Sequence, residues 1–195
     1  MKVLFVYPNS SGYSRIPMGL AVLVTYLKHN GHTIKIFDTT FYKTKERTDD
    51  QIRESLGQVR KADLSSVGVK FEYKTKEGIL EELHNVIADF SPDLCAFSVN
   101  EELTPVAYEM AEYIKHHFAI PVIFGGIGVT TCPQEVIEKF YVDMICLGEG
   151  EEALLELVNK MEQGKDISGI QNIWLKNNGD IIKNEPRPLT DLNKL

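Results

Sequence analysis

The sequence predicts an α/β fold, a doubly wound sheet of about five parallel strands with helices on both faces and a C-terminal β-hairpin. Short β-rich runs alternate with segments of helical periodicity, which is typical of βαβ units and a parallel sheet. The pattern changes after Gly164, where Asn177-Asn178-Gly179 separates two short runs as a hairpin turn does. At 195 residues the chain fits one globular domain with short appendages.

Each predicted strand is a short, mostly apolar run. The core strands are expected at Lys2–Tyr7, Thr33–Asp38, Asp93–Val99, Val122–Phe124 and Val142–Leu147. The run 93–99 is apolar almost throughout, as a strand covered on both faces should be. A further run, Val67–Phe71, is interpreted as either an edge strand or part of a loop.

Helices are predicted where apolar residues recur every three or four positions. They are expected at Met18–Asn30, Thr75–Phe90, Leu103–Phe118, Pro133–Phe140 and Glu149–Met161, with a weaker helix at Asp49–Arg60. Gly31 is a natural stop for the first of them. The chain therefore divides into an α/β domain at 1–165, a hairpin extension at 166–183 and an exit linker at 184–195, which has two prolines and no periodicity.

The composition argues against several classes of function. The net charge of −7 disfavours a general nucleic-acid or anionic-membrane surface, and it favours small-molecule or protein partners. No apolar run reaches the roughly 20 residues of a membrane span. Cys95, Cys132 and Cys146 are odd in number, scattered and without zinc spacing, which predicts a reducing, cytoplasmic location. Cys95 and Cys146 lie in strand-like runs and are expected to be buried.

Folds of this class bind ligands beyond the carboxyl ends of their parallel strands. Four predicted loops lie there: Pro8–Gly19, Asn100–Leu103, Gly125–Cys132 and Gly148–Glu151. Glycine permits sharp turns and close approach of a ligand, and a strand-to-helix junction leaves N–H groups for phosphate or other polar groups. The glycine-containing junctions Gly125–Cys132 and Gly148–Glu151 therefore place the expected binding edge in the C-terminal half.

These loops contain no known catalytic motif. Neither a Gly-x-Gly-x-x-Gly fingerprint nor a P-loop occurs, and no catalytic constellation is recognised. Arg15 could pair with an anionic ligand, although a lone loop arginine is more often solvated. Glu101 and Glu102 are interpreted as carboxylates in the first turn of a helix. The histidines lie on predicted helices or at helix ends, away from this edge.

Several loop residues are nevertheless candidates for binding. Ser98 and Asn100 are small hydrogen-bonding groups at the sheet edge. The segment 125–131 could hold an extended polar group, or it could form a tight turn in which Thr131 caps the next helix. Of Glu149 and Glu151, one is expected to cap the helix and the other to accept hydrogen bonds from ribose hydroxyls or amides.

In their order and spacing, these loop motifs resemble the N-terminal cobalamin-binding domain of cobalamin-dependent radical SAM enzymes. That group includes many methyltransferases and the anaerobic Mg-protoporphyrin monomethyl ester oxidative cyclase. The matching segments, within about residues 1–165, are Pro8, Ile16–Ala21, Asn30–His32, Asp38, Phe97-Ser98, Gly125-Gly126, Thr130, Pro133, Asp143 and Gly148–Glu151. The Asp-x-His-x-x-Gly motif of cobalamin mutases, whose histidine replaces the lower axial base, is absent after the first strand.

The resemblance implies that the corrin ring lies across the carboxyl edge of the sheet, with its dimethylbenzimidazole nucleotide tail running down into the fold. The implied cofactor-binding residues are Ser98 and Asn100 at the corrin or tail, Gly125, Gly126 and Thr130 along the tail, and Gly148, Glu149 and Gly150 beside the nucleotide. It also implies base-off cobalamin, with no histidine ligand from this chain.

A radical SAM barrel with a Cys-x-x-x-Cys-x-x-Cys site should follow the linker, binding S-adenosylmethionine and an iron–sulfur cluster. The three cysteines of this chain cannot supply that site. The chain is therefore expected to be a cobalamin module, cut or truncated from a larger enzyme such as a methyltransferase, that binds cofactor and catalyses nothing alone. Two alternatives stay open: a degenerate domain that serves as an interaction surface, and a nucleotide- or sugar-nucleotide-binding half of an unrelated enzyme.

Overall fold

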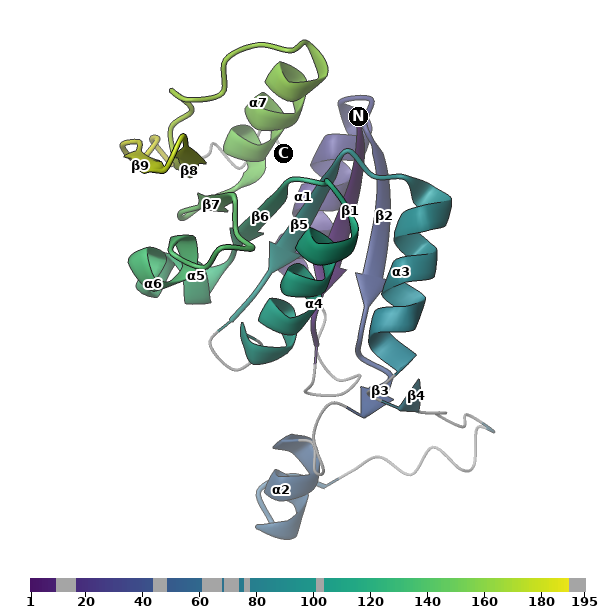
Figure 1. Ribbon diagram of the computed structural model, residues 1–195. Coiled ribbons are helices and arrows are strands. Elements are labelled where there is room, and N and C mark those ends of the chain that lie inside the picture. The colour runs from purple at the N-terminus through teal and green to yellow at the C-terminus, as the bar shows by residue number, and fades with distance from the viewer. Residues whose placement is uncertain are drawn as a thin grey trace.

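The computed structural model describes residues 1–9, 17–43, 49–60, 68, 74–75, 78–100 and 104–189 (Figure 1). The helices are α1 (Met18–His29), α2 (Asp49–Ser55), α3 (Gly78–Phe90), α4 (Thr104–His117), α5 (Ile127–Thr131), α6 (Pro133–Ile137) and α7 (Glu151–Glu162). The strands are β1 (Lys2–Tyr7), β2 (Thr33–Asp38), β3 (Tyr42–Lys43), β4 (Lys74–Thr75), β5 (Leu94–Ser98), β6 (Val122–Gly125), β7 (Met144–Cys146), β8 (Ile173–Asn177) and β9 (Asp180–Lys183).

The main sheet has seven strands in the order β2-β1-β5-β6-β7-β8-β9. The first five run parallel, whereas β8 is antiparallel to β7 and β9 is antiparallel to β8. The predicted α/β fold is confirmed, and the hairpin extends the same sheet. The order of the parallel strands reverses between β1 and β5, which is the position where such sheets bind ligands.

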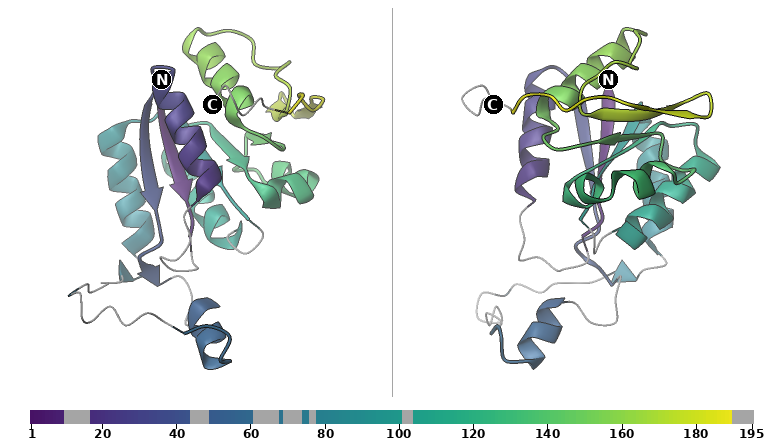
Figure 2. Two further views of the ribbon diagram at one scale, coloured as in Figure 1. Left: turned by 180° about the vertical axis from the view of Figure 1, so that it is seen from behind. Right: turned by 90° about the vertical axis from the view of Figure 1, so that its left-hand side faces the viewer.

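Helices cover both faces of this sheet (Figures 1 and 2). One core lies under α1 and α7, and it includes Val3 and Phe5 of β1. The other core lies under α3 and α4, and it includes Leu4 and Val6. Because successive side chains of a strand point to opposite faces, one apolar run supplies both cores. This is why β1 reads as an uninterrupted apolar segment.

The hairpin turn has the geometry that its sequence predicts. Asn177 pairs with Asp180, so the connection contains only Asn178 and Gly179. Their φ angles are 51° and 95°, and positive φ at both central positions defines the type I′ turn that suits the twist of a hairpin.

Several predicted bounds and elements differ from the structure; α7, for example, begins at Glu151 and not at Glu149. Thr75 belongs to β4, which pairs with β3, so α3 begins at Gly78. Helix α2 ends at Ser55, because Gly57 adopts a left-handed φ of 71° that stops the helix before Arg60. The segment 125–132, expected to be a loop, contains the five-residue helix α5.

Two other expectations come out differently. Cys132, and not Thr131, occupies the N-cap position of α6, which ends at Ile137 rather than Phe140. The Thr131 hydroxyl instead contacts the carbonyl oxygens of Ile127 and Gly128 within α5. Apart from Gly68, the run Val67–Phe71 lies outside the described residues.

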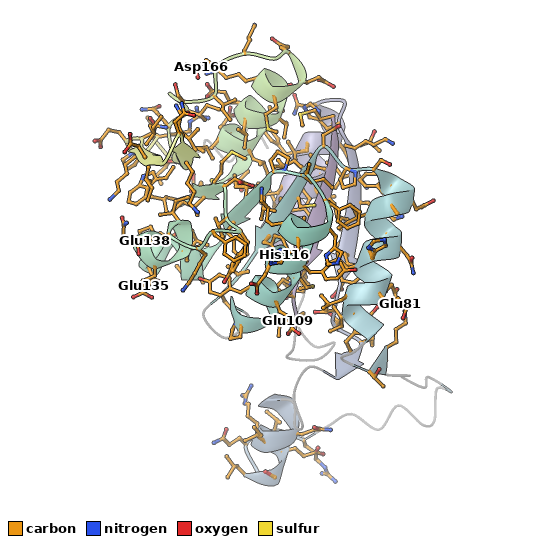
Figure 3. All side chains as sticks on the ribbon, in the orientation of Figure 1. Glu81, Glu109, His116, Glu135, Glu138 and Asp166 are labelled. Atoms are coloured by element: carbon orange, nitrogen blue, oxygen red, sulfur yellow. The ribbon has the colours of Figure 1, made fainter. Side chains whose placement is uncertain are left out.

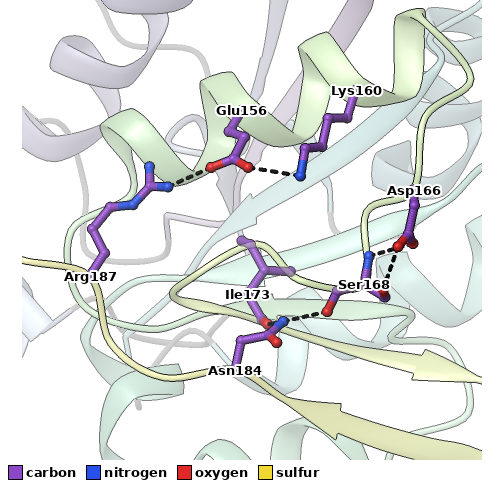
Figure 4. A network of polar contacts seen from close by, with 7 residues as sticks. All are labelled: Glu156, Lys160, Asp166, Ser168, Ile173, Asn184 and Arg187. Atoms are coloured by element: carbon purple, nitrogen blue, oxygen red, sulfur yellow. Dashed lines mark hydrogen bonds and ion pairs between the residues drawn. The ribbon is translucent and has the colours of Figure 1, made fainter.

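The segment after β9 is held against the domain by hydrogen bonds and an ion pair (Figure 4). The Asn184 amide donates to the carbonyl oxygens of Ser168 at 2.8 Å and Ile173 at 2.7 Å. The Arg187 guanidinium pairs with Glu156 on α7 at 2.5 Å, and Glu156 also binds Lys160 at 2.9 Å. The chain therefore leaves the sheet along α7.

Candidate functional site

A cavity of about 180 Å³ lies at the carboxyl edge of the sheet, between its central parallel strands and the helices α1 and α7. Its apolar wall is formed by Phe5, Leu23, Ala96, Ile123 and Leu154. Phe5, Ala96 and Ile123 are inward-facing residues of β1, β5 and β6, on the face covered by α1 and α7. The cavity thus lies beside the point where the strand order reverses.

The polar rim of the cavity comes from the loops that follow β5, β6 and β7. Its residues are Ser98, Gly125, Gly126, Gly148, Glu149, Gly150 and Glu151. Six of the eight residues that the sequence identified as cofactor-binding are among them. Asn100 and Thr130 do not line the cavity.

Thr130 connects the two glycine loops. Its hydroxyl lies 3.2 Å from the Gly126 carbonyl oxygen and accepts a hydrogen bond from the Gly148 N–H at 3.1 Å. Other N–H groups of the Gly125–Cys132 segment are also used internally: Gly128 donates to Val99 and Thr130 to Gly126. Thr130 therefore holds the two loops of the rim together. Some of the N–H groups that were expected to bind a ligand are instead used in hydrogen bonds within the loop.

Gly126 brings its loop against the end of β5. Its φ is 105° and its ψ 179°, a conformation available essentially to glycine alone. A Cβ at this position would lie 2.4 Å from the Val99 carbonyl oxygen. This contact alone requires glycine here, whether or not a ligand binds.

Gly150 allows α1 and α7 to approach each other beside the cavity. A Cβ on Gly150 would lie 3.3 Å from Cδ2 of Leu23 on α1. Gly150 is the N-cap residue of α7, so neither Glu149 nor Glu151 occupies that position. Glu151 stands in the first turn, where a carboxylate interacts favourably with the helix dipole.

Asn172 forms hydrogen bonds to the β7–α7 loop, a role that sequence reasoning missed. Its side-chain amide donates to the Glu149 carbonyl oxygen at 2.9 Å, and its own carbonyl accepts from the Leu147 N–H at 2.9 Å. Its Oδ1 accepts from the Arg187 N–H at 2.7 Å. Asn172 is buried with a left-handed φ of 69°, a conformation that asparagine adopts more readily than most residues. Its location, directly before the hydrophobic strand β8, gave no signal of this role.

The electrostatics of the cavity come mainly from burial. Burial, with a smaller contribution from the Glu151 carboxylate, raises the pKa of the Cys146 thiol to about 12. Burial and the hydrogen bond to Glu152 raise the pKa of Tyr26 on α1. Burial disfavours the charged form of Glu156, but its partners Lys160 and Arg187 lower its pKa overall. Cys146 is therefore a neutral, apolar part of the cavity wall.

Several acidic side chains outside the cavity are exposed. Figure 3 shows Glu81 on α3, Glu135 and Glu138 at α6, and Asp166 beyond α7, each on an outer surface. Two large apolar side chains, Met18 and Ile127, are also exposed, by 67% and 65%. Each directly adjoins in sequence a glycine that lines the cavity, Gly19 or Gly126.

All five histidines lie in the described part of the chain, and none lines the cavity. His32 is buried, and its Nε2 lies 3.1 Å from Oδ1 of Asn159. His84 and His117 contact Tyr113 between α3 and α4. Among the described residues, no cluster of three or more metal-ligating side chains is found. Nor does any described helix have the length and hydropathy of a membrane span.

Comparison with known proteins defines the class. Residues 6–158 match the family described as the B12 binding domain, B12 being cobalamin. The chain belongs to this family.

Its relatives are larger proteins. The chain is 29% identical over 132 residues to an uncharacterized methyltransferase of Pyrococcus horikoshii, covering 64% of this chain and 29% of the relative. It is 27% identical over 172 residues to the anaerobic magnesium-protoporphyrin IX monomethyl ester cyclase of Rubrivivax gelatinosus, covering 85% of this chain and 25% of that protein. The chain thus spans between a quarter and three tenths of the length of these curated relatives.

Solved structures show the same fold. The radical S-adenosylmethionine methyltransferase TsrM of Kitasatospora setae, with cobalamin and an iron–sulfur cluster bound, superposes with a TM-score of 0.70 at 24% identity, over 97% of this chain and 30% of TsrM. The cobalamin-dependent radical enzyme OxsB, with aqua-cobalamin and S-adenosylmethionine bound, gives 0.62 at 18% identity, over 96% of this chain and 22% of OxsB. The resemblance seen in the sequence is confirmed.

Proposed function

We propose that this domain binds cobalamin, with the nucleotide tail in the cavity under α1 and α7 and the corrin ring across the carboxyl edge of the sheet. The observation that carries the proposal is the cavity itself, which has an apolar wall, a rim of glycines and a position beside the switch point of the sheet. Membership in the B12-binding family supports the choice of ligand.

The size of the cavity supports partial entry of a large cofactor. Its volume of about 180 Å³ lies below the roughly 300 Å³ at which pockets begin to enclose a drug-sized ligand. It can therefore hold the benzimidazole ring and the groups attached to it, while the corrin macrocycle lies outside. The exposed Met18 and Ile127, each next in sequence to a glycine of the cavity, would cover apolar parts of the macrocycle.

The rim residues, together with Asn100 and Thr130 near them in sequence, would each have a different role in binding the cofactor. Ser98 and Asn100, at the end of β5, would contact the corrin or the upper tail. Gly125 and Gly126 would line the tail, and the segment Gly148–Gly150 would border the nucleotide, with Thr130 holding the two loops together.

We infer that the bound state is base-off, with no axial ligand from this chain. The apolar wall would accept the benzimidazole only if the base has left the cobalt, and no histidine lines the cavity to replace it. In the full-length protein we infer a C-terminal radical SAM domain that binds S-adenosylmethionine and an iron–sulfur cluster, and a methyltransferase activity. The cobalt would then carry a methyl group between S-adenosylmethionine and a substrate, while this chain orients the cofactor and excludes water from the tail.

The test is retention of hydroxocobalamin after desalting, followed by visible spectroscopy. The structure suggests Gly19→Phe as the blocking variant, because Gly19 lines the cavity mouth and a Cβ there meets no atom within 4 Å. Phenylalanine is also a better helix former than glycine, so folding should be preserved. Gly78→Phe, in the first turn of α3 on the opposite face, is the matched control, since a Cβ there also meets nothing.

We expect the wild type and Gly78→Phe to retain a base-off corrinoid and Gly19→Phe to lose it at unchanged thermal stability. Absence of any retained corrinoid in the wild type would contradict the proposed function. A base-on spectrum would contradict the placement of the tail.

A further inference from the structure

One carboxyl oxygen in the cavity wall has no hydrogen-bond partner. Oε2 of Glu151 is buried, and it is the single buried side-chain nitrogen or oxygen without a partner in the described part of the chain. Glu151 is the first residue of α7 and lines the cavity. A buried acceptor that is left unpaired is costly, the more so when it is charged. This oxygen therefore needs a hydrogen-bond donor that the protein does not supply.

The neighbouring carboxylates of the same helix have protein partners. Glu152 accepts a hydrogen bond from the Tyr26 hydroxyl at 2.9 Å. Glu156 binds both Lys160 and Arg187. Neither Glu152 nor Glu156 lines the cavity. Donors from α1, α7 and the C-terminal segment thus pair these two carboxylates, whereas the Oε2 atom of Glu151, which lines the cavity, stays unpaired.

The cavity wall offers Glu151 little to bind. Most of the wall is apolar carbon, and Cys146 remains a neutral thiol, which is a weak donor. The Gly148 N–H already donates to Thr130. The Ser98 hydroxyl also lines the cavity, but no protein group donates to Oε2 of Glu151, so a donor has to come from a molecule in the cavity.

We infer that Glu151 is a specificity-determining residue of this site, whose Oε2 accepts a hydrogen bond from an O–H or N–H group on the nucleotide tail of the cofactor. This inference rests on the proposed function. The nucleotide offers two kinds of donor, the free hydroxyls of the ribose and the ring nitrogen of the displaced benzimidazole in its protonated form. The macrocycle itself is too large for a cavity of about 180 Å³, and cobinamide, which keeps the amide side chains of the corrin, tests whether these supply the donor instead.

The experiment measures dissociation constants of hydroxocobalamin and of cobinamide, which lacks the nucleotide tail, for the wild type, Glu151→Gln and Glu151→Leu. Glu152→Gln is the matched control, because it removes the same charge from the next residue of the first turn but outside the cavity. A third ligand, p-cresolylcobamide, keeps the ribose and has no benzimidazole nitrogen, so it distinguishes the two donors.

We expect Glu151→Leu to weaken cobalamin binding about ten- to a hundredfold, the range for one hydrogen bond to a charged group, and to leave cobinamide binding unchanged. Without ligand, Glu151→Gln should unfold at no lower temperature than Glu152→Gln, since it removes an unpaired acceptor and not a paired one. Equal weakening of both corrinoids, or no weakening of either, would overturn the inference while leaving the proposed function intact. Failure of the wild type to bind either corrinoid would instead refute the proposed function.

Discussion

Replacing Gly126 by alanine tests whether this glycine is required by the fold itself. The φ of 105° with ψ of 179° lies in a region that costs other residues about 1–3 kcal/mol. The added Cβ would also lie 2.4 Å from the Val99 carbonyl oxygen and 3.0 Å from its nitrogen. Val99 cannot easily move away, because its N–H donates to Gly125 at 2.9 Å and its carbonyl accepts from Gly128 at 3.3 Å. Relieving such an overlap typically costs about a further 1–3 kcal/mol.

The expected destabilisation of Gly126→Ala is therefore at least about 2 kcal/mol, or roughly 4–8 °C in the thermal midpoint for a domain of this size. Gly125→Ala is the control, since its Cβ would meet Cys146 only at ordinary distances of 3.8 and 3.9 Å. Thermal denaturation followed by circular dichroism, without ligand, measures both. Equal midpoints for the two variants would refute the reasoning and leave ligand contact as the reason for the glycine.

Two further predictions concern other parts of the chain. Ellman's reagent should label only Cys132 in the native protein at about pH 8, because it is exposed while burial raises the pKa of Cys95 and Cys146 to about 12; rapid labelling of either buried thiol would contradict this. Arg187→Ala removes a partner that lowers the pKa of Glu156 below its ordinary 4.5, so the stability from this pair is present above about pH 4.5 and is lost as the pH falls through the folded-state pKa. Urea midpoints of the wild type and Arg187→Ala should differ at neutral pH and converge near pH 3, whereas a pH-independent difference would show that Arg187 acts by packing alone.

The strands could be predicted closely where composition and breakers agree. Lys2–Tyr7 and Thr33–Asp38 were predicted to the residue, because apolar or β-branched runs end there at Pro8 or follow Gly31. Helix α5 could not be predicted, because five residues are too few to show a helical period. It forms because the positive φ of Gly126 turns the chain so that Thr130 donates back to the Gly126 carbonyl.

The candidate site was predictable in its backbone and not in its walls. The rim glycines stand where strands end, and six of the eight predicted residues lie on the cavity. Phe5 and Ile123 look like any buried strand residues, and whether they enclose a cavity depends on how α1 and α7 lie across them. Glu151 was considered only as a cap or an acceptor, because the burial of one of its oxygens depends on the tertiary packing of the helix.

The glycines of this edge differ in what occupies the space of their missing side chains. Protein atoms take that space at Gly126, where an added Cβ would lie 2.4 Å from the Val99 carbonyl oxygen, and at Gly150, where it would lie 3.3 Å from Cδ2 of Leu23. At Gly19 and Gly148 a Cβ would meet nothing within 4 Å. The first pair therefore serves the protein, since it brings β6 to β5 and α7 to α1 and so builds the walls. The second pair leaves open space at the cavity, which is why a bulky residue at Gly19 should block binding without the strain that any side chain at Gly126 introduces.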